Sequence, residues 1–199
     1  MLLMLYDEEK TKDILAAMIT QLRPLIKKKK RILVAVDGRC AAGKTALTRC
    51  LQKELDCNVI HMDDFFLRPE QRSAERIAIP GENVDHERFL EEVIIPLKSG
   101  GPFSYRPFSC ELGELASPVA ITPKPLTIVE GAYSCHKDLW KYYDLHIFIG
   151  IDKKRQMQRI VERSGEEKAK QFGLLWIPLE ERYITACHIK EKCELKYEI

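Results

Sequence analysis

The fold of this chain is decided by one octapeptide, Gly38-Arg39-Cys40-Ala41-Ala42-Gly43-Lys44-Thr45. A glycine, four residues and then Gly-Lys-Thr is the pattern of a phosphate-binding loop. The apolar run at residues 32–36 precedes it and predicts a strand buried on both faces. Residues 44–55 follow with helical spacing. The octapeptide is therefore expected to join a strand to a helix, which is the position that phosphate binding requires.

Each part of this loop has an expected task in holding the phosphates of ATP. The glycines let backbone N–H groups turn inward, and the start of the helix adds its dipole. Lys44 should reach the β- and γ-phosphates, and Thr45 should place its hydroxyl on Mg²⁺. The alternative is a plain glycine turn between a strand and a helix. The predicted ATP-binding residues are Gly38, Cys40, Ala41, Ala42, Gly43, Lys44, Thr45 and Ala46.

Acidic residues follow two further predicted strands. Asp63 and Asp64 come after the strand at residues 58–61, and Glu130 ends the strand at residues 126–129. The carboxyl ends of parallel strands meet at one edge of a sheet, so these acids should lie beside the loop. We expect Thr45, Asp63 and Glu130 to hold Mg²⁺ and Asp63 to be the general base, although Asp64 stays open for that role. The alternatives are a loop or helix-cap pair for the aspartates and a buried salt bridge for Glu130.

Three arginines share one face of a predicted helix at residues 152–163, which starts at an acidic N-cap. They are Arg155, Arg159 and Arg163, each four residues apart. Arg159 and Arg163 are the expected catalytic cations, together with Lys44, because they are nearest to a lid expected at residues 164–178. The alternative is a solvated face paired with nearby glutamates.

Strands that alternate with helices predict an α/β fold, a three-layer P-loop NTPase architecture with a mostly parallel central sheet and a helical lid. One domain is expected over residues 1–199, with an N-terminal helical region within residues 1–30 that Pro24 stops. Residues 101–125 carry five prolines and should form loops and short strands. Residues 193–197 predict a last strand.

Composition excludes several functional classes. The 199 residues include 32 basic and 30 acidic ones, so the net charge of +2 gives no support to nucleic-acid or membrane binding. The basic run at residues 27–31 is interpreted as a solvated helix end. Seven cysteines, an odd number without a C-x-x-C pair, argue against both a disulfide framework and a zinc site and favour the cytoplasm. Residues 1–5 are too short for a signal peptide, and no later stretch is long enough to span a membrane.

The chain resembles the uridine kinase and phosphoribulokinase-like family of P-loop kinases. The resemblance rests on the octapeptide, on Met62-Asp63-Asp64-Phe65-Phe66, on Val84-Asp85-His86 and on Ile128-Val129-Glu130-Gly131. It implies ATP and Mg²⁺ as cofactors, Asp63 as base, and lid arginines at Arg159 and Arg163. It also implies an acceptor pocket, to which we assign Asp64, Asp85 and Phe108. In this family Asp85 corresponds to a residue that binds ribose hydroxyls, and Phe108 corresponds to a position that can stack on a base.

The chain departs from that family at two places. Phe108-Ser109-Cys110 is not followed by a nearby histidine, and Arg163-Ser164-Gly165 replaces an Arg-Gly-Arg run. We therefore expect a kinase acting on a small hydroxyl acceptor, with a uridine- or cytidine-like nucleoside as the leading candidate. Pantothenate, a nicotinamide nucleoside, glycerate or a sugar phosphate are the alternatives. A nucleotide-binding regulatory protein is disfavoured because no Asn-Lys-x-Asp motif is present. A homo-oligomer remains open.

Overall fold

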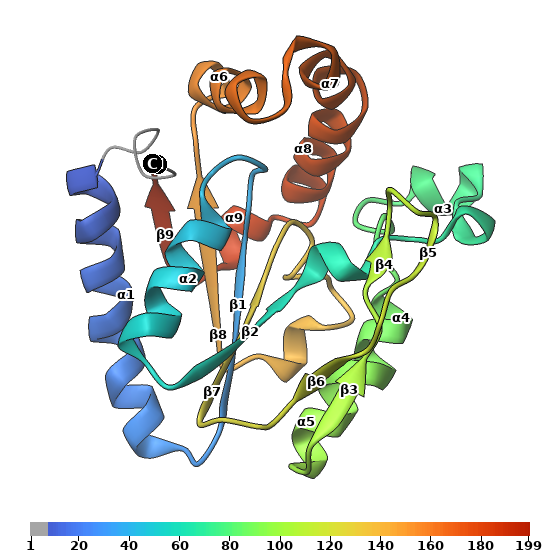
Figure 1. The fold of residues 1–199 in the computed structure, drawn as a ribbon. Helices are drawn as coiled ribbons and strands as arrows, with labels where there is room; N and C mark the ends of the chain where they lie inside the picture. Colours follow the sequence, from blue (N-terminus) through green and yellow to red (C-terminus); the bar gives the residue numbers. More distant parts are fainter. Residues whose placement is uncertain (1–7) are drawn as a thin grey trace.

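The computed structural model describes residues 8–199. Its centre is a five-stranded sheet with the order β2-β7-β1-β8-β9, in which every neighbouring pair is parallel (Figure 1). The strands are β1 (Ile32–Gly38), β2 (Cys57–His61), β7 (Leu126–Glu130), β8 (Leu145–Gly150) and β9 (Leu195–Glu198). All residues of β7 and β8 are buried, which explains why both strands are mostly apolar in sequence. The predicted α/β fold with a parallel sheet is confirmed.

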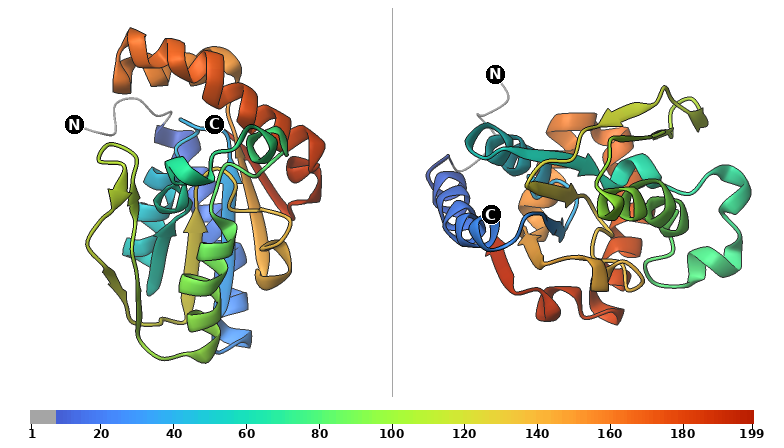
Figure 2. Two further views of the ribbon diagram at one scale, coloured as in Figure 1. Left: turned by 90° about the vertical axis from the view of Figure 1, so that its right-hand side faces the viewer. Right: turned by 90° about the horizontal axis from the view of Figure 1, so that it is seen from below.

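Helices cover both faces of the sheet (Figure 2). On one face α1 (Glu8–Lys28) and α2 (Lys44–Glu54) bury Met18, Leu22 and Leu51 against the strands. On the other face the helical segment of α4 (His86–Phe89), a π-helical turn (Leu90–Ile94) and α5 (Ile95–Ser99) packs with α8 (Ile177–Ala186). This second core contains Phe65, Phe89 and Tyr183. The two apolar layers hold the sheet rigid beneath its carboxyl edge.

The N-terminal helix corrects one expectation. Pro24 does not stop it, because α1 continues for four more residues to Lys28. Proline lacks the N–H that would bond four residues back, which weakens a helix interior. Leu25 and Ile26 pack against the core under α1, and this burial offsets the lost hydrogen bond.

The basic run at residues 27–31 begins in the last turn of α1 and is a solvated helix end, as expected. Lys27 and Lys28 form the last turn of the helix. Lys29 Nζ lies 2.6 Å from Asp144 Oδ1, and Arg31 donates to the carbonyl oxygen of Gly100 at 3.0 Å. Within residues 8–199, no helix is both long enough and apolar enough to cross a lipid bilayer.

A chain of helices lies above the carboxyl ends of the strands (orange to red in Figure 1). It consists of α6 (Lys153–Ser164), α7 (Glu166–Gln171), a π-helical turn (Phe172–Trp176) and α8. The short α9 (Ile189–Lys192) follows α8 and leads into the start of β9. Asp152 caps α6 by accepting from Arg155 N at 3.0 Å, as predicted. Pro178 sits in the first turn of α8, where a missing N–H costs little.

The irregular segments form the remaining side of the molecule. Residues 101–125 contain two antiparallel pairs, β3 (Phe103–Tyr105) with β6 (Val119–Ile121) and β4 (Phe108–Ser109) with β5 (Glu114–Leu115). Residues 62–85 contain two 3-10 turns, Met62–Phe65 and Pro69–Gln71, and α3 (Ala74–Ala78); a further 3-10 turn is Trp140–Tyr142. The parts of these segments around Asp63, Asn83 and Cys110 lie beside the carboxyl edge of the sheet, so they can contribute side chains to a site there.

Candidate active site

A cavity of about 800 Å³ opens at the carboxyl edge of the sheet. The phosphate-binding loop, the ends of β2 and β7 and the lid segment all contribute to its wall. This volume lies within the usual range for small-ligand sites. The wall includes Lys44, Thr45, Asp63, Glu130, Arg163 and Trp176.

The loop between β1 and α2 has two backbone positions whose positive φ requires glycine. Gly38 has φ of 134°, and a Cβ there would lie 2.0 Å from the carbonyl oxygen of Ile149. Gly43 has φ of 90°, directly before the first residue of α2. Lys44 Nζ donates to the carbonyl oxygens of Gly38 (2.7 Å) and Arg39 (3.0 Å). The loop therefore wraps around the lysine at a helix N-terminus, which is the arrangement that binds phosphate.

The sheet register brings the predicted carboxylates to this loop. Val36 of β1 and His61 of β2 both pair with Glu130 of β7. Thr45 Oγ1 donates to Glu130 Oε1 at 2.9 Å, and His61 Nδ1 lies 2.6 Å from the same oxygen. Asp63 lines the cavity beside them. Thr45, Asp63 and Glu130 thus form one cluster of oxygen atoms.

The two carboxylates have opposite pKa shifts. Asp63 is open to the cavity, yet protein atoms crowd its other sides; this burial raises its pKa, and the charge of Glu130 adds to the rise. Burial also opposes ionisation of Glu130, but the hydrogen bond from His61 and the charge of Lys44 outweigh it and lower the pKa. Opposite shifts in neighbouring acids are typical of a base beside a permanently charged partner.

The same cluster fits Mg²⁺ by the chemistry of its donors. A hydroxyl and two carboxylates are the hard oxygen ligands that Mg²⁺ prefers, and Mg²⁺ usually takes few protein ligands. Thr45 and Glu130 are already within 2.9 Å of each other. His61 was not predicted, although its place at the end of β2 next to the aspartates could have indicated it.

The two lid arginines occupy different places. Arg163 lines the cavity, and its guanidinium carbon lies 5.5 Å from the centre of the Phe172 ring. Arg159 is buried behind the loop and donates to the carbonyl oxygen of Ala41 at 3.2 Å. Arg163 is therefore placed to contact a ligand, whereas Arg159 supports the loop.

The three residues assigned to the acceptor are held by the protein itself. Asp64 Oδ2 accepts from the Tyr105 hydroxyl at 2.9 Å. Asp85 caps α4 through Arg88 N at 3.1 Å and accepts from Gln71 Nε2 at 2.8 Å. Phe108 is buried in β4. None of the three is among the described residues that line the cavity, whereas Phe66, Arg72, Asn83, Cys110 and Tyr133 from the neighbouring segments do line it.

Helix α8 supplies two carboxylates that the sequence did not reveal. Glu180 Oε2 accepts from the backbone N–H of Cys40 at 2.8 Å, and Glu181 accepts two hydrogen bonds from Arg39. Burial raises the pKa of Glu180 to about 7, although the charge of Lys44 opposes the rise. Helix α8 is thereby bonded to the loop. No motif marks these acids, because they lie in a helix far along the chain.

Asp37, the residue before the loop, was also missed. Its carboxylate accepts from Tyr133 N (3.2 Å), Cys135 N (2.8 Å) and the Tyr183 hydroxyl (2.7 Å). It therefore ties the end of β1 to the segment after β7 and to α8. In the sequence, Asp37 looks like any polar residue near the end of a strand, so its contacts with distant segments could not be predicted.

No protein-family model matches this chain, and no curated protein matches its sequence. Solved structures do share its fold. One is a D-glycerate 3-kinase from Cryptococcus neoformans, with 15% identity, a TM-score of 0.63, and coverage of 95% of this chain and 94% of that one. A second, from a Silicibacter species, is provisionally described as a fructose transport system kinase, with 21% identity, a TM-score of 0.61, and coverage of 93% and 98%.

A third similar structure is described as a possible uridine kinase from Bacillus stearothermophilus. It has 17% identity and a TM-score of 0.59, and the match covers 91% of this chain and 99% of that one. At such identities the likeness concerns the fold and leaves the acceptor undetermined. The chain has the P-loop kinase fold that these three structures share.

Proposed function

We propose that this chain is an ATP-dependent kinase that transfers the γ-phosphoryl group to a hydroxyl of a small metabolite. The observation that carries the proposal is the meeting of Lys44, Thr45, Asp63 and Glu130 in one cavity beside the phosphate-binding loop. A loop alone would bind a nucleotide. An adjacent carboxylate with a raised pKa adds the base that a transfer to an alcohol uses.

Each residue has a stated part in the transfer. The loop N–H groups and Lys44 hold the β- and γ-phosphates in position. Asp63 takes the proton of the acceptor hydroxyl as its oxygen bonds to the γ-phosphorus, while the bond from that phosphorus to the β–γ bridging oxygen breaks and ADP leaves. Arg163 stabilises the charge on the migrating group from the lid side. Thr45, Asp63 and Glu130 would hold Mg²⁺, which would neutralise charge on the phosphates when bound.

A uridine- or cytidine-like nucleoside is the first acceptor candidate. It is supported by the resemblance at Asp63, Asp85 and Glu130 and by the fold shared with the possible uridine kinase. Binding of the ribose by Asp85 would require this carboxylate to turn from Gln71 toward the cavity.

An acceptor with an anionic group is the second candidate, and Arg72 favours it. Arg72 lines the cavity and is exposed, and its Nε donates to the carbonyl oxygen of Leu67 at 2.9 Å. Among residues 8–199 no carboxylate lies within ion-pair distance of its guanidinium. A cation with room for a carboxylate or phosphate suits glycerate or a sugar phosphate.

A coupled ADP-release assay across nucleosides, vitamins, hydroxy acids and sugar phosphates tests the proposal. ADP release that depends on one class of acceptor supports it, and release that ignores every acceptor contradicts it. Arg72→Gln separates the two candidates. It should raise KM at least tenfold for an anionic acceptor and leave KM for uridine unchanged. Arg155 does not line the cavity, so Arg155→Gln is the matched control and should leave both KM values unchanged.

A further inference from the structure

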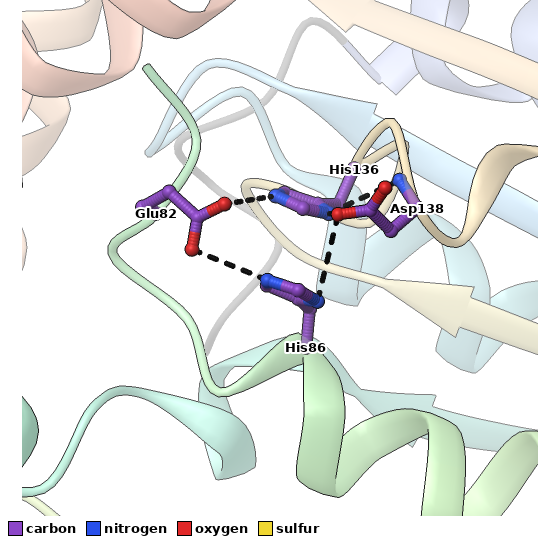
Figure 3. Close-up of side chains that lie close together, drawn as sticks. All are labelled: Glu82, His86, His136 and Asp138. Atoms are coloured by element: carbon purple, nitrogen blue, oxygen red, sulfur yellow. Dashed lines mark hydrogen bonds and ion pairs between the residues drawn. The ribbon is translucent and has the colours of Figure 1, made fainter. Parts of the chain in front are cut away.

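Two histidines and two carboxylates form a cluster that the proposed transfer does not use. Glu82 lies in the loop before α4, His86 is the first residue of α4, and His136 and Asp138 follow β7 (Figure 3). One ligand atom from each residue lies within 4.8 Å of those of the other three. Imidazole and carboxylate groups from separate segments at this spacing are the ligands of a transition-metal site.

The distances at one end of the cluster suit zinc. Glu82 Oε2 lies 3.2 Å from His86 Nε2, and Glu82 Oε1 lies 3.5 Å from His136 Nε2. Bonds of 2.0–2.1 Å in a tetrahedral zinc site place neighbouring ligand atoms about 3.3 Å apart. Glu82 is therefore already at ligand distance from both ring nitrogens.

His136 gives independent support. Its side chain is 1% exposed, and its Nε2 atom has no hydrogen-bond partner. A buried nitrogen without a partner is costly and calls for an explanation. A metal ion bound to Nε2 would supply the missing partner.

Asp138 occupies the opposite end of both rings. Its Oδ2 lies 3.9 Å from His86 Nδ1 and 3.8 Å from His136 Nδ1. Histidines that bind a metal through one nitrogen commonly direct the other N–H to a carboxylate. As the side chains stand, His136 Nδ1 accepts from Asp138 N at 3.3 Å. Zinc on Nε2 would put the ring proton on Nδ1, so this hydrogen bond would break and the N–H would turn to the Asp138 carboxylate.

We propose that Glu82, His86 and His136 bind a zinc ion, with Asp138 orienting the two rings and water completing the coordination. The rings are stacked, with centres 4.1 Å apart and planes 17° apart. Nitrogen lone pairs lie in the ring plane, so each ring must turn about its Cβ–Cγ bond to face the ion. This torsion is broad for histidine, which keeps the rearrangement local.

The surrounding charges favour a divalent cation. Arg76 Nε and Lys137 Nζ approach Glu82 at 3.5 and 3.9 Å. Glu87 lies 2.6 Å from Arg76 and 3.6 Å from His86, so three carboxylates, including Asp138, face two cationic side chains. The zinc would join the loop that carries Asn83 to the segment that carries Tyr133, both in the cavity wall. The site would therefore brace the acceptor side of the cavity.

Titration of the purified full-length protein with Zn²⁺, and with Co²⁺ as a visible-absorption probe, tests this site. Excess Mg²⁺ is present throughout to occupy the carboxylates near Thr45. We expect one equivalent of Zn²⁺ that raises Tm by about 5–10 °C at a hundredfold excess over Kd. His86→Asn and the exposed Asp138→Asn should each weaken binding at least tenfold.

His188→Asn is the matched control, because asparagine tolerates the left-handed backbone at that position. It should leave zinc binding unchanged. Equal zinc affinity in the wild type and in both cluster variants would overturn the proposal, and so would a wild type without a zinc-dependent Tm. These readouts do not depend on phosphoryl transfer, so the outcome is separate from that of the kinase proposal.

Discussion

The phosphate side and the acceptor side of the cavity differ in how the chain builds them. The phosphate side is one continuous loop and two strand ends, and the predicted residues Lys44, Thr45 and Glu130 bond directly to one another or to the loop. The proposed acceptor side comes from several separated loops, and the predicted Asp64 and Asp85 do not line it, because they are engaged by Tyr105 and Gln71. Phosphate binding depends on backbone geometry that a short motif encodes. Acceptor binding depends on side chains that only the tertiary structure brings together.

Removing the proposed base, Asp63, should have the largest effect on the phosphate side. Asp63→Asn keeps the shape of the side chain but cannot take a proton, so we expect kcat to fall by about 10²–10⁴-fold with ATP affinity largely kept. Steady-state kinetics with ATP-binding calorimetry provide the measurement. A near-normal kcat for Asp63→Asn would show that another group is the general base. The variant Asp64→Asn, measured in parallel, tests whether that group is the neighbouring aspartate.

Replacing Lys44, the lysine of the phosphate-binding loop, should have the second-largest effect on activity. Lys44→Ala removes the cation that faces the β- and γ-phosphates, and we expect a drop of about 10²-fold in kcat/KM together with weaker ATP binding. ADP binding should weaken less than ATP binding. Unchanged affinity for both nucleotides would contradict the function of the octapeptide.

Glu180 in α8 should make KM for ATP depend on pH. Glu180 contacts Cys40 N and lies near the charges of Lys44 and Asp37. Its pKa is about 7, so it becomes negative as pH rises through 7 and then repels the ATP phosphates. KM for ATP should rise about three- to tenfold between pH 6 and pH 8. Glu180→Gln should flatten this profile, while Glu181→Gln should keep it; the same slope in both variants would exclude Glu180 as its source.

The smallest effect is expected on the acceptor side, at Asp85. Asp85→Ala removes the N-cap of α4, which costs about 1 kcal/mol and should lower Tm by about 2–4 °C. Asp85→Asn keeps a capping oxygen but loses the charge. If Asp85 also binds the acceptor, both variants raise KM for the acceptor and leave KM for ATP alone. A Tm change in the alanine variant without any change in KM would restrict Asp85 to its structural role.

Local signals predicted most of the fold. The alternation of buried strands and helices, the Gly-Lys-Thr loop and the Asp152 cap all depend on neighbouring residues, and all appear as expected. The helix that continues through Pro24 was not predictable, because packing by Leu25 and Ile26 overrides a local penalty. His61, Asp37 and Glu180 reach the site through pairing register and helix packing. Those contacts join residues far apart in the sequence.

The most direct test of the central claim is to follow the label from ATP carrying a labelled γ-phosphoryl group in the presence of the acceptor found by the panel. The account predicts that the label appears on the acceptor hydroxyl, one equivalent for each ADP formed, and that Asp63→Asn abolishes this transfer. Label that appears in inorganic phosphate at the same rate with or without the acceptor would contradict it.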